Sequence, residues 1–194
     1  MKAKATRRLV IRKDRTKETL EALQSLVRQQ VLVGIPESTS DRDDEDGSGL
    51  TNAQIGYLQE TGCPETNLPA RPFLVPGTEE AEDRTVPLLK EAAKATLRGN
   101  PEKARAQLSD AGIVASNSVK RRINSNIPPP LSPYTVANRA RSRGSKTSRA
   151  SERAYLRMVA LGADPGEAQD EAGIIALVNT GQLRNSITSV VRKK

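Results

Sequence analysis

The chain of 194 residues contains no histidine, no tryptophan and a single cysteine. Histidine is the commonest general base, the commonest zinc ligand and the usual partner of a nucleophilic serine or cysteine, so its absence removes most hydrolase and zinc-enzyme designs. Cys63 has no imidazole to activate it and no second cysteine to pair with, which favours a reducing compartment such as the cytoplasm. We therefore expect a protein that is not an enzyme, with no catalytic residue and no cofactor.

Large apolar side chains and long apolar runs are equally scarce. Aromatic residues make up 2% of the chain, and hydrophobic residues 36%. A core built mainly from Leu, Ile, Val and Ala is expected to be modest, and more apolar surface is expected to become buried on assembly. No apolar run is long enough to cross a membrane, and only Leu9–Ile11 follows the basic N-terminus, so we predict neither a membrane partner nor a signal peptide.

Positive charge is in excess, with a net charge of +8. Such a charge favours nucleic acid, an anionic membrane or an acidic protein face, without choosing among them. One basic run stands out; it comprises Arg139, Arg141, Arg143, Lys146, Arg149 and Arg153. No aromatic residue interleaves it to stack on a base, so a solvated loop, docking on an acidic neighbour and phosphate binding all stay open.

An acidic, Ser/Gly-rich stretch at 37–49 suggests calcium at first sight. Counted from Asp41, the sixth position is Asp46 rather than glycine, and the twelfth is Asn52 rather than glutamate, so the EF-hand spacing fails. We predict a solvated loop, or a loop that docks on a basic partner, and no metal site.

Periodicity and capping residues predict an α+β fold, with a small, mostly antiparallel sheet flanked by helices and long polar loop insertions. Strands are expected at 30–35 and 187–192. Helices are expected at about 15–29, with Leu20, Leu23 and Val27 on one stripe, and between Thr51 and Gly62. Four prolines predict an extended connector over 63–76.

The second half of the chain carries the clearest helical signal. After a helix at about 78–98, Asn100 and Pro101 are typical of a new helix start. Its apolar stripe consists of Ala104, Leu108, Ala111, Ala115, Val119 and Ile123. Prolines break the helical pattern after 124, and a short helix is expected at 150–161. We predict one domain over 1–194, with a basic arm at 1–13, an acidic insertion at 37–49 and a basic and polar insertion at 139–175.

Two motifs mix turn residues with apolar anchors. The first runs from Asn52 to Gly62 and on through Leu68–Leu74, and the second spans Leu177–Thr188. With the segments Val33–Pro36 and Pro130–Ala137 they form an ordered series that touches most of the chain. This series resembles the tail-completion and head–tail joining (neck, tail-terminator-like) proteins of long-tailed bacteriophages.

The resemblance implies a structural virion protein of the phage neck. Such proteins form a homomeric ring at the head-proximal end of the tail, complete or terminate the tail and join it to the head connector. The expected partners are other copies of the chain, as a hexamer by analogy with the tail tube, then the tail tube protein and connector or neck proteins, with non-specific contact with passing DNA left open. The chain would be assembled in the host cytoplasm. The alternative is a basic nucleic-acid-binding protein acting during virion assembly or DNA packaging.

The residues proposed to contact subunits or partners fall into two groups. Arg71, Phe73 and Leu74 lie in the proline-stiffened connector, where Arg71 could pair with a carboxylate within or between subunits, and Phe73 could be either a core residue or an intersubunit anchor. The charged insertions supply the second group, which could meet across a ring interface; it consists of Asp43, Asp44, Asp46, Arg139, Arg141 and Arg143.

Overall fold

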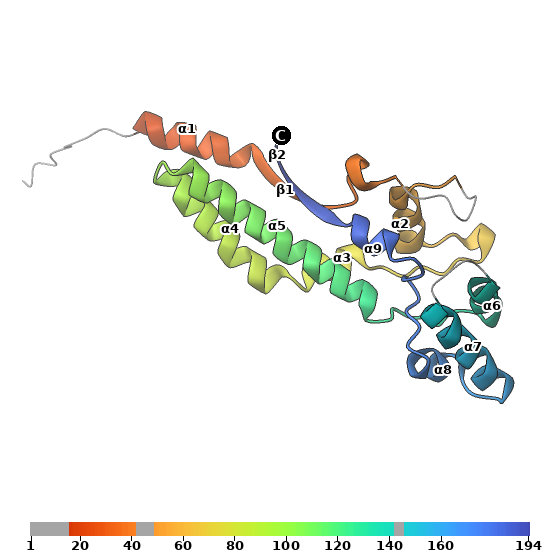
Figure 1. The fold of residues 1–194 in the computed structure, drawn as a ribbon. Coiled ribbons are helices and arrows are strands. Elements are labelled where there is room, and N and C mark those ends of the chain that lie inside the picture. Colours follow the sequence, from red (N-terminus) through yellow and green to blue (C-terminus); the bar gives the residue numbers. More distant parts are fainter. Residues whose placement is uncertain (1–15, 42–48, 142–145) are drawn as a thin grey trace, which may run out of the picture.

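The computed structural model describes residues 16–41, 49–141 and 146–194, and confirms the predicted α+β class. Helices dominate, and one two-stranded antiparallel sheet joins segments from near the two ends of the chain (Figure 1). The elements in order are α1 Thr16–Val27, β1 Gln29–Gly34, α2 Asn52–Thr61, α3 Leu74–Glu79, α4 Glu82–Leu97, α5 Pro101–Asn124, α6 Pro133–Arg141, α7 Lys146–Ala160, α8 Pro165–Glu171, α9 Gln182–Ser186 and β2 Thr188–Lys193. Two short 3-10 turns lie at Glu37–Thr39 and Pro64–Thr66.

Helix α5 is the long spine of the molecule and pairs with α4 as a helical hairpin (Figure 1). Its start is the predicted one, because the Asn100 side chain accepts a hydrogen bond from the Lys103 backbone N–H (3.0 Å) and Pro101 occupies the first helical position. All six residues of the predicted apolar stripe are buried. The stripe therefore faces the core, as its spacing predicted.

The sheet lies across α5 in the register Leu32↔Val190. Its inner face approaches the helix so closely that a Cβ at Gly112 would lie 2.6 Å from Ser189 Oγ and 3.1 Å from Val31 Cγ1. On the outer face, Leu32 and Val190 stay exposed. Both predicted strands are confirmed within one or two residues, and their antiparallel pairing brings 29–34 and 188–193 together.

Two small cores hold the helices. The first lies between α3, α5 and β2 and consists of Phe73, Val119, Ile123, Ile127, Leu177 and Ile187. The second lies among α6, α7 and α8 and consists of Leu131, Val136, Tyr155, Ala168, Ile174 and Ala176. The stretch 139–175, which was expected as a basic and polar insertion, thus supplies helices and core residues.

Two predictions in the middle of the chain are wrong in detail. The helix expected at 78–98 is two helices, since α3 begins at Leu74 and α4 at Glu82. The connector accordingly ends at Phe73, and Pro76 lies in the first turn of α3, where its missing N–H removes no helical hydrogen bond. The proline-rich stretch after Ile127 also ends sooner than predicted, because Pro133 opens α6.

Helix α1 forms where it was predicted, but it buries none of its residues. Leu20, Leu23 and Val27, the predicted apolar stripe, are 55%, 44% and 79% exposed. Helix α1 touches α4 and β1 without being covered by either. In the described part of the chain, no helix combines the length and the apolar character needed to span a membrane.

Replacing Gly77 with alanine should lower the free energy of unfolding by about 1–3 kcal/mol, because the new methyl group overpacks a closed contact. A Cβ at this position would lie 2.8 Å from the Val119 Cα, a backbone atom that cannot swing away. The loss should appear although alanine has the higher helix propensity by about 1 kcal/mol.

Urea unfolding followed by circular dichroism measures this change. Gly34→Ala is the matched control, because a Cβ there meets nothing within 4 Å. A Gly77→Ala protein as stable as the Gly34→Ala protein would contradict the close α3–α5 contact.

Candidate assembly site

The first motif forms α2, whose two ends are those predicted from the sequence. Thr51 and Gln54 make a capping box: Gln54 Oε1 accepts the Thr51 N–H (2.8 Å), and Thr51 Oγ1 accepts the Gln54 N–H (3.3 Å). Gly62 ends the helix at φ 74°, and a Cβ there would lie 2.7 Å from the Ala70 backbone nitrogen. The chain can therefore fold back along α2 only with glycine at this position.

The second motif meets the first at Gly56, in the middle of α2. A Cβ at Gly56 would lie 3.0 Å from Ile35 Cδ1, 3.5 Å from Leu183 Cδ1 and 3.7 Å from Phe73 Cζ. Ile35 follows β1 and Leu183 lies in α9, so three segments distant in sequence converge on one glycine. The Thr39 hydroxyl, which donates to the Ser186 carbonyl (2.8 Å), adds a polar contact between the same regions.

Glu60, near the end of α2, fixes the start of α3. Its carboxylate accepts the backbone N–H groups of Phe73 (2.7 Å), Leu74 (2.8 Å) and Val75 (3.1 Å). These donors belong to the first turn of α3, which has no side-chain cap of its own. A carboxylate also suits the positive end of a helix dipole. Glu60 thus caps a helix that begins more than a dozen residues later in the chain.

Arg71 attaches the connector to the middle of the chain. Its Nε and Nη2 donate to the Pro129 carbonyl at 3.1 Å and 2.8 Å, and Nη2 also reaches the Pro130 carbonyl at 3.4 Å. The residue is 4% exposed, and burial lowers the pKa of its guanidinium. The suggested carboxylate partner is therefore replaced by backbone carbonyls of the same chain, and Arg71 offers no surface to a neighbour.

Phe73 and Leu74 occupy different positions. Phe73 is 2% exposed at the centre of the first core, so it is a core residue of this chain and the alternative of an intersubunit anchor does not fit its burial. Leu74 is half-buried and packs at the edge of that core. Of the connector residues chosen from the sequence, Leu74 alone combines core contact with partial exposure.

Arg139 does not belong to a solvated loop. It lies in α6 and donates to the carbonyls of Ala176 (2.7 Å) and Ile175 (3.4 Å), close to the second motif. Burial lowers the pKa of Arg139, the carboxylate of Glu152 opposes this shift, and the charge of Arg71 adds to it. This arginine thus joins α6 to the segment that leads into the second motif.

The remaining charged candidates are exposed or undescribed. Arg141 is exposed, and its Nε donates to the Ala137 carbonyl of its own helix (3.2 Å). Asp43, Asp44, Asp46 and Arg143 lie outside the described residues. The structure therefore leaves the proposed contact between the two charged insertions untested.

An apolar hollow of about 190 Å³ opens beside the point where the motifs meet. Gly34, Gly56, Phe73 and Leu74 line it, and Tyr57, which is 70% exposed, stands on its rim. A second hollow of about 340 Å³ shares Gly34 and Ile35 with the first and extends over the outer face of the sheet. Together they give the molecule a continuous, partly apolar surface, which is typical of a site of protein contact.

The described contacts of this region are packing contacts and hydrogen bonds to backbone groups. Within residues 16–41, 49–141 and 146–194, no group of three or more Cys, Asp or Glu side chains is placed to hold a metal ion. Comparison with known proteins found no relative: no protein-family model, no curated protein and no solved structure matches the chain.

Several residues that build this region were not singled out from the sequence. Glu60 is the clearest, and its signal was a carboxylate two residues before a helix-ending glycine, with a helix start further on that has no capping side chain of its own. In the second core, the Tyr155 hydroxyl donates to the Leu131 carbonyl (2.8 Å), and burial raises its pKa. Gln169 accepts the Leu131 N–H (2.6 Å), which no local pattern predicts.

Glu60→Ala should lower the free energy of unfolding by about 3 kcal/mol, because three backbone donors lose a charged acceptor. Glu60→Gln keeps one acceptor oxygen without the charge and should lose about half as much. Chemical denaturation of the purified variants gives both values. Glu65→Ala, at an exposed position in the following turn, is the control and should change stability by less than about 0.5 kcal/mol. Equal values for the alanine and glutamine variants would contradict a charge-assisted cap.

Proposed function

We propose that the chain is a structural protein of the neck of a long-tailed bacteriophage. In this proposal, copies form a closed homomeric ring that completes or terminates the tail and joins it to the head connector. The tail tube protein and the connector or neck proteins are its partners, and the protein acts without catalysis. The expected location is the head-proximal end of the tail in the virion.

The observation that carries the proposal is the convergence of the family-like segments in space. Val33–Pro36, Asn52–Gly62, Leu68–Leu74, Pro130–Ala137 and Thr180–Ile187 are separate in sequence, yet each contacts another through Gly56, Glu60, Arg71 or Phe73. Segments that define one family should build one structural unit, and these segments do so. Chance matches spread along the chain would have no reason to touch.

The distribution of apolar surface supports assembly. A two-stranded sheet is marginal by itself, and of the elements in the described part of the chain α5 covers its inner face and none covers its outer face. Large apolar side chains remain exposed on α1, α2, α3 and the sheet; among them are Leu23, Leu32, Tyr57, Val75 and Val190. Burial of such surface between copies would add stabilisation that a single chain of this composition lacks.

Deleting the gene for this chain from the phage that encodes it should leave full heads and separate tails, because the joining step has lost its ring. Adding the purified protein to an extract of such cells should restore joined particles, counted by electron microscopy and by plaque titre. Normal head–tail joining in the deletion strain would overturn the proposal.

The same purified protein distinguishes the nucleic-acid alternative. Binding to duplex DNA that falls steeply with salt, together with unaffected head–tail joining, would favour a nucleic-acid-binding protein. Weak DNA binding with loss of joining fits the ring, through which DNA would pass.

A further inference from the structure

Two surfaces of opposite charge lie on different sides of α5. The first, the acidic corner, is the turn between α3 and α4 with the exposed residues Val75, Glu79, Glu82 and Asp83. The exposed Arg84 follows them, so these four charged side chains sum to −2. The second, the outer sheet face, is the uncovered side of the sheet with the exposed residues Arg28, Leu32, Val190 and Arg192. Helix α5 contacts both α4 and the sheet, and Figure 1 shows it between them.

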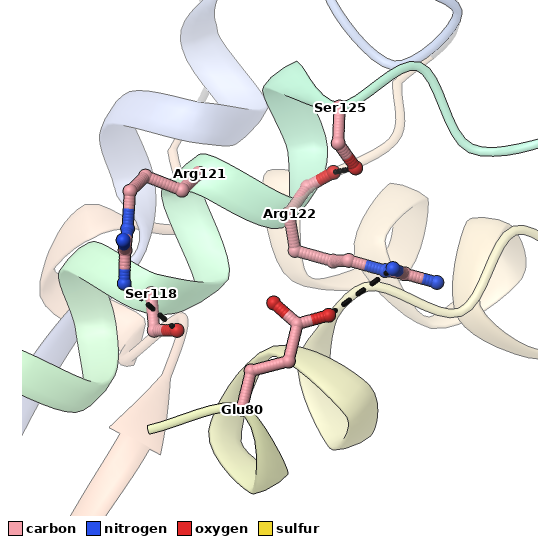
Figure 2. A network of polar contacts seen from close by, with 5 residues as sticks. All are labelled: Glu80, Ser118, Arg121, Arg122 and Ser125. Carbon is pink, nitrogen blue, oxygen red and sulfur yellow. Dashed lines mark hydrogen bonds and ion pairs between the residues drawn. The ribbon is translucent and has the colours of Figure 1, made fainter. Parts of the chain in front are cut away.

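The acidic corner is held rigidly. Gly77 packs against the backbone of Val119, and Glu80 forms an ion pair with Arg122 of α5, with Glu80 Oε1 and Arg122 Nη1 3.1 Å apart. Figure 2 shows the Glu80 side chain extending from α3 to meet the Arg122 guanidinium, while Arg121 turns away toward Ser118. The corner therefore presents its free carboxylates from a fixed backbone.

The carboxylates of Glu79, Glu82 and Asp83 form no ion pair with a residue in the described part of the chain. Glu82 and Asp83 lie in the first turn of α4, where they suit the helix dipole, but this leaves their outer oxygens in water. Val75 adds an apolar side chain, 56% exposed, in the neighbouring helix α3. The corner combines free negative charge with apolar surface.

The outer sheet face has the complementary character. Leu32 and Val190 are cross-strand partners and are 40% and 42% exposed. Arg192 contacts the neutral side-chain amide of Gln30. With the amide oxygen turned toward the guanidinium, this oxygen accepts a hydrogen bond from Arg192 Nε at 2.7 Å. Neither Arg28 nor Arg192 forms an ion pair with a described residue. The exposed Glu37 lines the same hollow as Arg192, so the described charges of this face sum to a net positive charge.

We propose that the outer sheet face of one copy binds the acidic corner of the next copy. Because the two surfaces differ and lie on different sides of α5, the contact is head-to-tail, and repeating it generates a ring when the rotation closes. This inference rests on the homomeric ring of the proposed function and identifies its contact surfaces. A two-fold contact of either surface with itself would place like charges together.

Among the described residues, a second acidic surface on α8 competes for the arginines. Its exposed carboxylates are Asp164, Glu167, Asp170 and Glu171. Two of them already serve the chain, since Asp164 caps α8 and Asp170 accepts a hydrogen bond from Asn126 Nδ2 (2.6 Å). The acidic corner has more free charge and lies beside the first core, so it is the better match.

Reciprocal charge reversal tests the proposal on the full chain. One variant carries Glu79→Lys, Glu82→Lys and Asp83→Lys, and the other carries Arg28→Glu and Arg192→Glu. The control, Glu167→Lys with Glu171→Lys, makes a comparable change on α8. Native mass spectrometry and sedimentation velocity give the subunit number, and thermal melting followed by circular dichroism verifies the fold.

The wild-type protein and the α8 control should form the same ring. Each reversed variant alone should be monomeric at concentrations about 100-fold above those at which the wild type assembles, because like charges then face each other. An equimolar mixture of the two reversed variants should regain an oligomer with alternating subunits, since every contact again joins opposite charges. A misfolded variant could not give this rescue.

Three results would overturn the inference: a wild-type protein that stays monomeric at all concentrations, reversed variants that assemble normally, or loss of assembly in the α8 control alone. The second and third results leave the proposed function intact, because head–tail joining in the deletion strain is scored independently. The first result also removes the homomeric ring, and head–tail joining in the deletion strain then decides whether the neck role stands. A ring that survives both reversals would leave the neck role intact and place its interface elsewhere.

Discussion

The close contact between α5 and the sheet at Gly112 is the constraint on which the rest of the structure depends. Two strands alone are marginal, and this pair persists because its inner face lies directly on the helix, with Ser189 and Val31 against the glycine. The contact holds together strands that lie near opposite ends of the chain. It thereby brings α9, which precedes β2, onto α2 and creates the meeting point of the two motifs. A larger side chain at Gly112 would separate all of these elements.

Two charged side chains, the buried Arg71 and the half-buried Glu60, stabilise the connector in a chain that has few large apolar side chains. With aromatics at 2% of the chain, the connector has few apolar contacts to hold it. Glu60 binds it from one side through backbone N–H groups, and Arg71 fixes it to the Pro129 carbonyl on the other. Charged side chains lose hydration on burial, so they stabilise a fold only when their hydrogen bonds are made. Here the partners are backbone groups, whose positions no change of neighbouring side chain can remove. The result is a connector of defined shape built with little hydrophobic area.

Sequence patterns correctly predict the helices and strands that depend on interactions between residues close in sequence. The stripe of α5, the box at Thr51, the stop at Gly62 and both strands follow from spacing and capping chemistry, and the structure has them. The packing of the elements depends on contacts between residues that are distant in sequence. Gly77 lets α3 lie close against Val119 of α5, and Arg139 donates to the carbonyls of Ile175 and Ala176. A sequence pattern cannot reveal either contact, so for Arg139 a solvated loop, docking on an acidic neighbour and phosphate binding all stayed open. The apolar spacing of α1 correctly predicts a helix. This spacing does not tell whether another element covers the stripe, and the structure buries none of its residues.

The scarcity of large apolar side chains also affects how copies of the chain would bind one another. Exposed ion pairs are individually weak, and the apolar side chains left on the surface are scattered over several elements. A single contact between an outer sheet face and an acidic corner would therefore be modest.

In the proposed closed ring, however, every copy makes this contact twice, and one copy can leave only when two interfaces break together. The second contact forms within an assembled particle, at a high effective concentration, so weak interfaces give a stable ring while open intermediates stay rare. In the proposed ring, contacts between copies would compensate for the small core of the single chain.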